Sequence, residues 1–164
     1  MSDLINRKSV IKVQRCLHEY DKNIELIVLD ETARTAKDAA KSLNTKVGSI
    51  VKSLLFKDSE ENYHLCLISG EKFASTKKIA DLVNLPITKA NADECKAFTG
   101  FSIGGVSPIA HDNIPKSILI DTSLSKYEKV FAAAGHPYVV FGVSYTTLRN
   151  LTKGTEYNLS LIHI

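Results

Sequence analysis

A lysine within an apolar run is the first residue of this sequence whose position indicates chemistry. Residues 49–57 have the composition of a β-strand, and side chains alternate between the two faces of a strand. Lys52 therefore shares its face with three large apolar residues, Ile50, Leu54 and Phe56. Burying an ammonium group without a partner is costly. The amine either reaches into a cleft and meets a ligand oxygen, or it lies at a strand edge with its charge in water.

A glycine-rich loop over residues 99–108 is the second candidate. It contains the run Gly104-Gly105-Val106-Ser107-Pro108, whose two glycines let the backbone approach a ligand closely. The loop matches neither the phosphate-binding G-K-[ST] pattern nor the dinucleotide G-x-G-x-x-G pattern. It is either a wall of a ligand site or an ordinary connection between two elements.

The third candidate is Gly135-His136-Pro137, which separates two apolar runs. An imidazole at this break could donate a hydrogen bond or move a proton near neutral pH. The simpler alternative is that His136 caps a turn between two strands.

Metal sites and the usual enzymic nucleophiles are not expected. Cys16, Cys66 and Cys95 are widely spaced, and the five histidines lack the spacing of zinc ligands. The sequence also contains no G-x-S-x-G segment and no recognisable Ser/His/Asp or Cys/His set. We therefore expect no metal and no cofactor.

Five helices are expected to help position the candidate residues, over 9–20, 35–43, 75–85, 91–99 and a short segment after 144. Side chains that accept a hydrogen bond from the first turn begin four of these helices. These N-cap residues are Thr35, Ser75, Asn91 and Ser144. Glu94, three residues after Asn91, predicts a capping box.

Six strands are expected over residues 24–29, 49–57, 63–69, 117–121, 130–134 and 138–143, and residues 158–164 are either a terminal strand or a tail. The polar stretch 58–62 predicts an antiparallel hairpin. Strands joined by tight turns, without regular β-α-β alternation, are typical of the α+β class. We expect one domain over residues 1–164, with a mixed, largely antiparallel β-sheet flanked by helices.

The composition excludes several classes of protein. With 44% hydrophobic and 24% charged residues, a chain of 164 residues is typical of a soluble globular domain. No apolar run is long enough for a transmembrane helix, and the N-terminus lacks the apolar core of a signal peptide. We therefore expect a cytoplasmic protein without membrane contact. The net charge of +3 permits an anionic partner such as RNA without requiring one.

Together these motifs resemble the YbaK/EbsC family, which is related to the insertion editing domain of bacterial prolyl-tRNA synthetases. The matching segments are residues 35–40 (TAKDAA), 50–54 (IVKSL), 104–108 (GGVSP, the G-x-x-x-P loop of the family) and 130–137 (VFAAAGHP). The resemblance spans roughly residues 24–151, which is most of the chain. It implies a YbaK-like fold and a pocket for the aminoacyl end of tRNA.

The resemblance also implies an activity and roles for individual residues. Family members hydrolyse mischarged aminoacyl-tRNA in trans, commonly tRNA charged by prolyl-tRNA synthetase. Lys52 would be the essential pocket lysine, the loop 104–108 would shape the pocket, and Gly135 and His136 would occupy the third signature position. Ser53 is expected to tune specificity. Ala110 stands where many relatives carry glycine, which predicts a different pocket size.

A mechanism without an enzymic nucleophile follows as a hypothesis. The neighbouring hydroxyl of the terminal ribose, or a water that it orients, would attack the ester, and a substrate thiol could attack its own ester. Lys52 would polarise the aminoacyl carbonyl, and the backbone of Gly104 and Gly105 would stabilise the oxyanion. A small pocket predicts a small side chain such as alanine, cysteine, serine or threonine.

Contacts with tRNA are expected to be electrostatic and sensitive to salt. The candidate lysines are Lys46, Lys72, Lys77, Lys78 and Lys89, supported by Arg7, Lys12 and Arg15 on the first helix. Each of them is equally explained as a solvated surface cation. An aminoacyl-tRNA synthetase is a further candidate partner, and the charge pattern does not determine the oligomeric state.

Two alternative functions stay open at this point. The first is a non-catalytic module that binds aminoacyl-tRNA or a synthetase. The second is an amidase or esterase that acts on small molecules, which would hydrolyse free amino-acid esters without tRNA.

Overall fold

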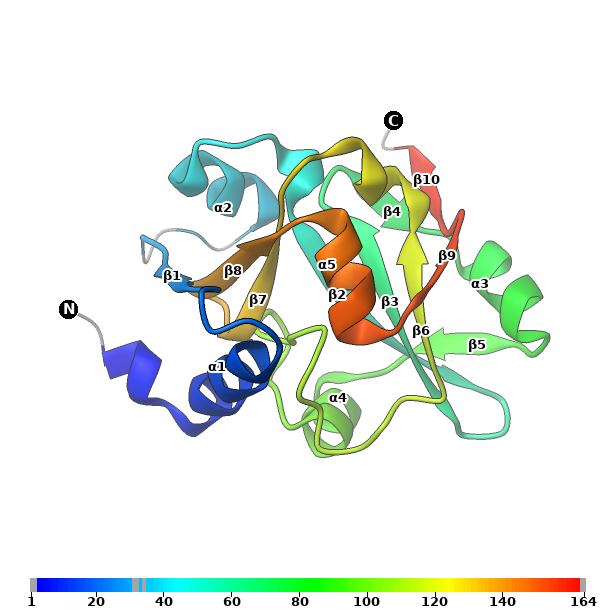
Figure 1. Cartoon of the computed structure of the whole chain (residues 1–164). Helices are drawn as coiled ribbons and strands as arrows, with labels where there is room; N and C mark the ends of the chain where they lie inside the picture. The colour runs from blue at the N-terminus through cyan, green and yellow to red at the C-terminus, as the bar shows by residue number, and fades with distance from the viewer. Residues whose placement is uncertain (1–2, 31–32, 34, 163–164) are drawn as a thin grey trace.

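The computed structural model describes residues 3–30, 33 and 35–162, and its helices flank three β-sheets (Figure 1). The α-helices are α1 (Lys8–Tyr20), α2 (Ala36–Leu43), α3 (Thr76–Val83), α4 (Ala92–Thr99) and α5 (Tyr145–Thr152). Short 3-10 helices span Asp3–Asn6, Val47–Ser49 and Thr122–Lys126. The strands are β1 (Leu26–Val28), β2 (Val51–Asp58), β3 (Tyr63–Ser69), β4 (Lys72–Ala74), β5 (Ile87–Lys89), β6 (Ser117–Asp121), β7 (Val130–His136), β8 (Val139–Val143), β9 (Thr155–Tyr157) and β10 (Ser160–Ile162).

The helices begin where their capping side chains predict. The side chains of Thr35, Ser75 and Ser144 each accept a hydrogen bond from the backbone N–H three residues later. Asn91 and Glu94 form the expected capping box in both directions. Each cap satisfies N–H groups that have no partner inside the helix, which explains why local sequence is enough to place these helix starts.

The strands divide among three sheets, and the expected α+β class with mixed, largely antiparallel pairing is confirmed. A five-stranded sheet has the order β5-β2-β3-β6-β9, in which β3, β6 and β9 are parallel and the other pairs antiparallel. A small sheet has the order β1-β8-β7, and β4 pairs with β10 in a two-stranded ribbon. A parallel bridge between Ile50 and Phe131 joins the small sheet to the start of β2.

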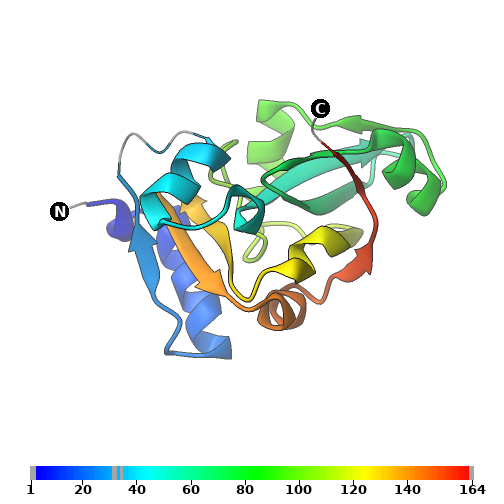
Figure 2. The ribbon, with the colours of Figure 1, turned by 90° about the horizontal axis from the view of Figure 1, so that it is seen from above.

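The small sheet lies between two helices (Figure 2). Val10, Val13 and Leu17 of α1 are completely buried in a core that contains one face of β7 and β8. Phe131 and Val140 belong to the opposite face and pack with α2. The alternation of side chains along a strand thus provides a separate apolar surface for each helix.

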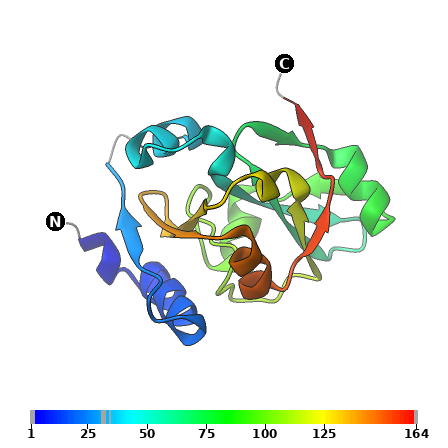
Figure 3. The ribbon, with the colours of Figure 1, turned by 45° about the horizontal axis from the view of Figure 1, so that its top comes forward.

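Three short strands, β4, β5 and β9, were not expected from the sequence. Each has three residues, which is too few for a recognisable alternation, and each is defined by pairing with a longer or distant strand. The segment expected to be a strand or a tail contains β10, which runs beside β4 at the end of the molecule away from α1 (Figure 3). Its last two residues lie outside the described part of the chain.

Candidate functional site

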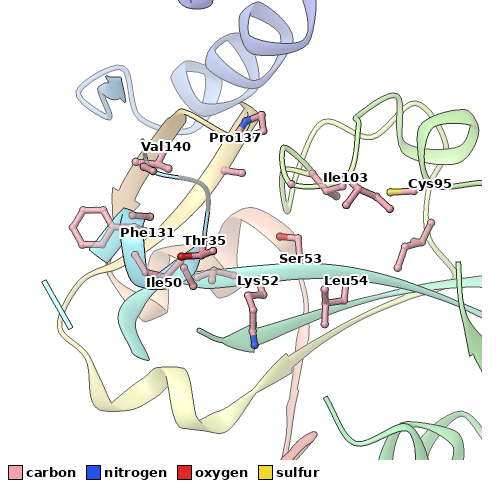
Figure 4. Close-up of a pocket in the computed structure, with 18 of the residues that line it drawn as sticks. Thr35, Ile50, Lys52, Ser53, Leu54, Cys95, Ile103, Phe131, Pro137 and Val140 are labelled. Carbon is pink, nitrogen blue, oxygen red and sulfur yellow. The ribbon is translucent and has the colours of Figure 1, made fainter. Parts of the chain in front are cut away.

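A cavity of about 290 Å³ lies where β2 passes beneath the small sheet (Figure 4). Val51, Ser53 and Leu55 of β2 line its floor. One wall comes from α2 and the small sheet, with Ala36, Ala39, Phe131, Ala133, Pro137 and Val140. The other comes from the glycine-rich loop and α4, with Ala90, Cys95, Ile103, Gly104 and Val106. The walls are mostly small or apolar, as in pockets that bind small molecules.

Ser53 is the polar group at the floor of the cavity. Its side chain rises from β2 between Pro137 and Val140 on one side and Ile103 and Cys95 on the other (Figure 4). Among the residues that the structure describes, Ser53 Oγ is the only buried side-chain nitrogen or oxygen without a hydrogen-bond partner. An unsatisfied buried hydroxyl is unusual, because it loses hydrogen bonds to water without replacing them.

Lys52 points to the other side of β2, as strand alternation requires (Figure 4). It shares that side with Leu54 and Phe56, which pack in a separate apolar cluster, and this part of the expected face is confirmed. The Lys52 ammonium donates a hydrogen bond to the backbone carbonyl of Lys72 in β4. Burial lowers the pKa of Lys52, and the positive charge of Lys89 lowers it further.

A basic depression adjoins the cavity on the Lys52 side. Lys37, Lys52, Lys72 and Lys126 line it together with one acidic residue, Glu71. Glu71 accepts a hydrogen bond from the Tyr127 hydroxyl at 2.9 Å and lies 3.9 Å from Lys126. Thr35, Ala36 and Lys52 line both the depression and the cavity. An anionic group in the depression would therefore lie next to an occupant of the cavity.

Only part of the loop 104–108 contributes to a wall of the cavity. Gly104, with a φ of 92°, and Val106 line the cavity. The Gly105 N–H donates to the Ser102 carbonyl at 2.9 Å, and a Cβ at Gly105 would lie 2.9 Å from the Cα of His136. Ser107 and Pro108 are buried behind the wall and do not line the cavity. Glycine at 105 is thus required for close packing of the loop on β7.

In the segment Gly135-His136-Pro137, only Pro137 lines the cavity. Gly135 packs against α1, because a Cβ there would lie 2.4 Å from the carbonyl oxygen of Ser9. His136 accepts a hydrogen bond from the Tyr138 N–H at 3.1 Å, which matches the turn-capping alternative. Burial lowers the pKa of His136, and the positive charge of Arg7 lowers it further. Gly135 and His136 support the pocket from behind in this structure.

Two of the five lysines expected to bind tRNA lie at the site. Lys89 lines the cavity and Lys72 lines the depression. Lys78 donates to the Ser160 carbonyl at 2.8 Å and so fastens α3 to β10. Lys77 pairs with Asp81 within α3 at 3.2 Å, and Lys46 is exposed before a 3-10 helix. The last three are therefore not gathered around the cavity.

The N-terminal basic residues lie on α1, away from the lining residues. Lys12 pairs with Asp112 at 2.8 Å and lies 4.2 Å from the centre of the Phe101 ring. Arg7 precedes α1 and Arg15 is exposed on it. The contacts of Lys12 fasten α1 to the glycine-rich loop, which is a structural role.

Several lining residues were not singled out from the sequence. They are Ala33, Ala36 and Ala39 around α2, Phe131, Ala133 and Val140 of the small sheet, and Cys95 of α4. The small residues on one face of α2 could have predicted the cavity from the sequence, because small side chains leave space between this helix and β2. Burial raises the pKa of the Cys95 thiol, so this group has little thiolate character.

Ala110 does not line the cavity, so the expected effect of this residue on pocket size is wrong. Its φ of 64° places it in the left-handed region, which explains why glycine suits the position in relatives.

Within the described residues, no group of three or more His, Cys, Asp or Glu side chains is arranged to hold a metal ion. None of the described helices is both long enough and apolar enough to cross a bilayer.

Solved structures with this architecture match nearly the whole of this chain. One, described as a "putative trans-editing enzyme for prolyl tRNA synthetase", is 33% identical, has a TM-score of 0.89, and is matched over 94% of this chain and 98% of its own. The hypothetical protein APE2540 is 25% identical, with a TM-score of 0.79 over 89% of this chain and 99% of its own. The fold is thus shared with a protein described as a putative trans-editing enzyme.

The model of the aminoacyl-tRNA editing domain matches residues 30–151, and the chain belongs to this family. The resemblance to YbaK/EbsC proteins is thereby confirmed. Among curated relatives, the uncharacterized protein YwhH of Bacillus subtilis is 25% identical over 77% of this chain and 80% of its own length. The proline–tRNA ligase of Thermosipho africanus is 30% identical over 71% of this chain, a match that spans 20% of the ligase.

Proposed function

We propose that this protein is a trans-editing deacylase that hydrolyses the ester between a small, wrong amino acid and tRNA. Membership of the editing family supports the reaction class. The ligase match supports tRNA-Pro, or a related tRNA, as the carrier. The observation that carries the proposal is the cavity of about 290 Å³ between β2, the small sheet and the glycine-rich loop.

The size of the cavity supports a small substrate side chain. Pockets for small ligands are about 300–1,000 Å³, so this cavity lies at the lower limit. The side chains of alanine, cysteine, serine and threonine fit within this volume, and Phe131 and Val140 are large lining residues that would limit the size of an occupant. Such a sieve rejects large residues better than small ones, which suits an enzyme that removes small errors.

The chemistry is assigned to the substrate and to backbone and lysine groups. The neighbouring ribose hydroxyl orients a water that adds to the ester carbonyl. The bond from the carbonyl carbon to the ribose oxygen breaks, that oxygen takes a proton from the water, and the free amino acid and tRNA leave. With a cysteinyl ester, the substrate thiol can attack its own carbonyl instead, so that the same bond breaks, the ribose oxygen takes the thiol proton and the amino acid leaves as a cyclic thioester. The Gly104 N–H is the oxyanion donor in this proposal, since the Gly105 N–H is already bound to Ser102.

Lys52 holds the reacting ester in this mechanism. Lys52 lines both the cavity and the basic depression, and its ammonium points away from Ser53 and donates a hydrogen bond to the Lys72 carbonyl. A substrate oxygen replaces that carbonyl when the aminoacyl end enters. The exchange keeps the ammonium hydrogen-bonded, and its cost is the hydrogen bond that the Lys72 carbonyl loses.

The test is single-turnover deacylation of alanyl-, cysteinyl-, seryl- and threonyl-tRNA by the wild type and by Lys52→Ala. We expect the variant to lose about a hundredfold or more in rate, the effect of removing one group that stabilises a developing oxyanion. Lys116→Ala, an exposed lysine outside the lining residues, is the matched control. Full activity of Lys52→Ala would remove this residue from the mechanism.

A non-catalytic binding module is the second candidate function. It is favoured by the bond between Lys52 and the Lys72 carbonyl, which directs the ammonium away from Ser53. Tight binding of aminoacyl-tRNA without hydrolysis of any ester in the panel would support it. Hydrolysis of free amino-acid esters at the same rate as aminoacyl-tRNA would instead indicate a small-molecule esterase.

A further inference from the structure

The unpartnered hydroxyl of Ser53 provides information about the substrate that the size of the cavity does not. Ser53 Oγ is buried, lies on the floor of the cavity and has no hydrogen-bond partner. We propose that Ser53 is a specificity residue that binds the side-chain hydroxyl of a seryl or threonyl group. This inference rests on the proposed function and adds the substrate class to it.

The substrate offers three polar groups that could meet Ser53, and the surroundings of the cavity distinguish them. Its lining residues include the cations Lys52 and Lys89 and, within the described chain, no carboxylate. The α-ammonium group is therefore poorly placed beside Ser53, because the charged residues that line the cavity are both cationic and no carboxylate among them neutralises it. The α-ammonium is better accommodated where the cavity opens to solvent.

The ester carbonyl is the second group, and it must remain near the oxyanion donor. In the mechanism proposed above, that donor is the N–H of Gly104, a lining residue from the glycine-rich loop. Ser53, in contrast, lies on the floor (Figure 4). A carbonyl bound at the wall directs the amino-acid side chain toward the floor. The side chain of the amino acid is thus the group that reaches Ser53.

A hydroxyl satisfies Ser53 better than the other small side chains. A hydroxyl both donates and accepts, so it can pair with Ser53 Oγ whichever oxygen provides the proton. A methyl group leaves Ser53 unsatisfied, and a thiol is a weak donor and a weak acceptor. The apolar walls around Ser53, such as Leu55 and Val140, are compatible with the extra methyl group of threonine.

The first experiment measures binding without catalysis. The probes are tRNAs whose terminal ribose carries a 3′-amino group joined to alanine, serine or threonine by an amide, which the protein cannot release as an ester. We expect wild type to bind the seryl and threonyl probes about tenfold more tightly than the alanyl probe, the effect of one added hydrogen bond. Equal affinity for all three probes would overturn the proposal.

The second measurement uses Ser53→Ala with the same probes and with the corresponding esters in single-turnover deacylation. We expect the variant to lose the tenfold preference, so that the seryl and threonyl substrates are bound no more tightly than the alanyl substrate. A uniform loss on all three substrates would show that Ser53 is only structural and would overturn the proposal. Ser59→Ala, at an exposed serine of the β2–β3 turn that lines neither hollow, should change none of the values.

The two proposals fail in different ways. If the wild type prefers the hydroxyl-bearing probes but hydrolyses none of the esters, the specificity role stands and the deacylase proposal fails. If it hydrolyses alanyl-, seryl- and threonyl-tRNA equally, the deacylase proposal stands and the role of Ser53 fails. Thermal unfolding provides the folding control, since Ser53→Ala removes an unsatisfied buried group and should not lower the melting temperature.

Discussion

Lys52 and Ser53 are neighbours in the chain but occupy different surroundings, because successive side chains leave a strand on opposite faces. Ser53 faces the cavity without a partner, whereas Lys52 reaches an oxygen of β4. A ligand would give Ser53 the hydrogen-bond partner that it lacks and would replace the carbonyl that accepts from Lys52. In the proposed site, Ser53 on the floor therefore binds the side chain of the amino acid, and Lys52 binds the ester.

A single residue just after the glycine-rich loop provides a test of backbone strain. Ala110 has a φ of 64°, a conformation that costs a residue with a Cβ about 1–2 kcal/mol. Glycine avoids that cost but loses about 0.4–1 kcal/mol through the greater freedom of the unfolded chain. We expect Ala110→Gly to raise the free energy of unfolding by about 0.5–1 kcal/mol, measured by urea denaturation.

The matched comparison is Ala97→Gly. Ala97 is exposed in the middle of α4, where glycine should lower the free energy of unfolding by about 1 kcal/mol. Opposite signs for the two substitutions would support the strain at Ala110. Destabilisation by both would show that Ala110 is not strained.

At the scale of elements, a buried polar network holds the end of the β2–β3 hairpin to β6. His64 lies 2.8 Å from Asp58 Oδ2 and 2.6 Å from the Ser117 hydroxyl. Asp58 also accepts hydrogen bonds from the backbone N–H groups of Glu60 and Asn62. The set resembles a hydrolase triad in residue type, but none of its members lines the cavity. Its role is to fasten three strands together.

This network predicts how stability depends on pH. Burial alone would raise the pKa of Asp58, but the hydrogen bonds from His64 and from the hairpin backbone lower it below the ordinary value. Because the folded pKa is the lower one, the stabilisation is present above the unfolded pKa of about 4 and is lost as the pH falls through the folded pKa.

Urea unfolding of the wild type and Asp58→Asn between pH 7 and pH 3 tests this expectation. The wild type should be more stable at pH 7, and the difference between the two should shrink below about pH 4. The exposed Asp81, which pairs only with Lys77 in α3, provides the control variant Asp81→Asn. A difference that stays constant down to pH 3 would contradict the assignment.

At the scale of the whole molecule, charge is gathered beside the site rather than spread as a strong overall excess. The net charge is only +3, yet four lysines line the basic depression and Lys89 lies at the cavity. The depression adjoins the cavity through Thr35, Ala36 and Lys52. This arrangement suits the phosphates of a single-stranded tRNA end whose aminoacyl group occupies the cavity.

The dependence of tRNA binding on salt tests this arrangement. Each phosphate contact with a single strand contributes about 0.7 to the slope of log K against log salt concentration. We expect Lys72→Ala combined with Lys126→Ala to reduce the magnitude of that slope by about 1.4, because two phosphate contacts are lost. Alanine at position 72 still has the backbone carbonyl that accepts from Lys52, so that hydrogen bond is retained. The double variant Lys22→Ala, Lys116→Ala removes two exposed lysines that do not line either hollow and should leave the slope unchanged.

The amino-acid sequence by itself determined the local helices and strands and identified the candidate site residues. Capping side chains such as Thr35 and Asn91 located helix starts, and alternation placed Lys52 on the face of Leu54 and Phe56. These features depend on interactions over a few residues, which a sequence displays directly. The motifs around Lys52 and Gly104 also indicated the family, which the match over residues 30–151 confirmed.

Only the tertiary structure decided what each candidate touches. The carbonyl oxygen that accepts from Lys52 belongs to β4. Helix α2 lines the cavity with Ala36 and Ala39, and its position beside β2 and β7 results from packing that no local sequence pattern shows. His136 turned out to bind the Tyr138 backbone, and Ser53 to lack any partner. Such contacts join segments that are far apart in the chain, and whether a polar group is satisfied depends on all the elements packed around it at once.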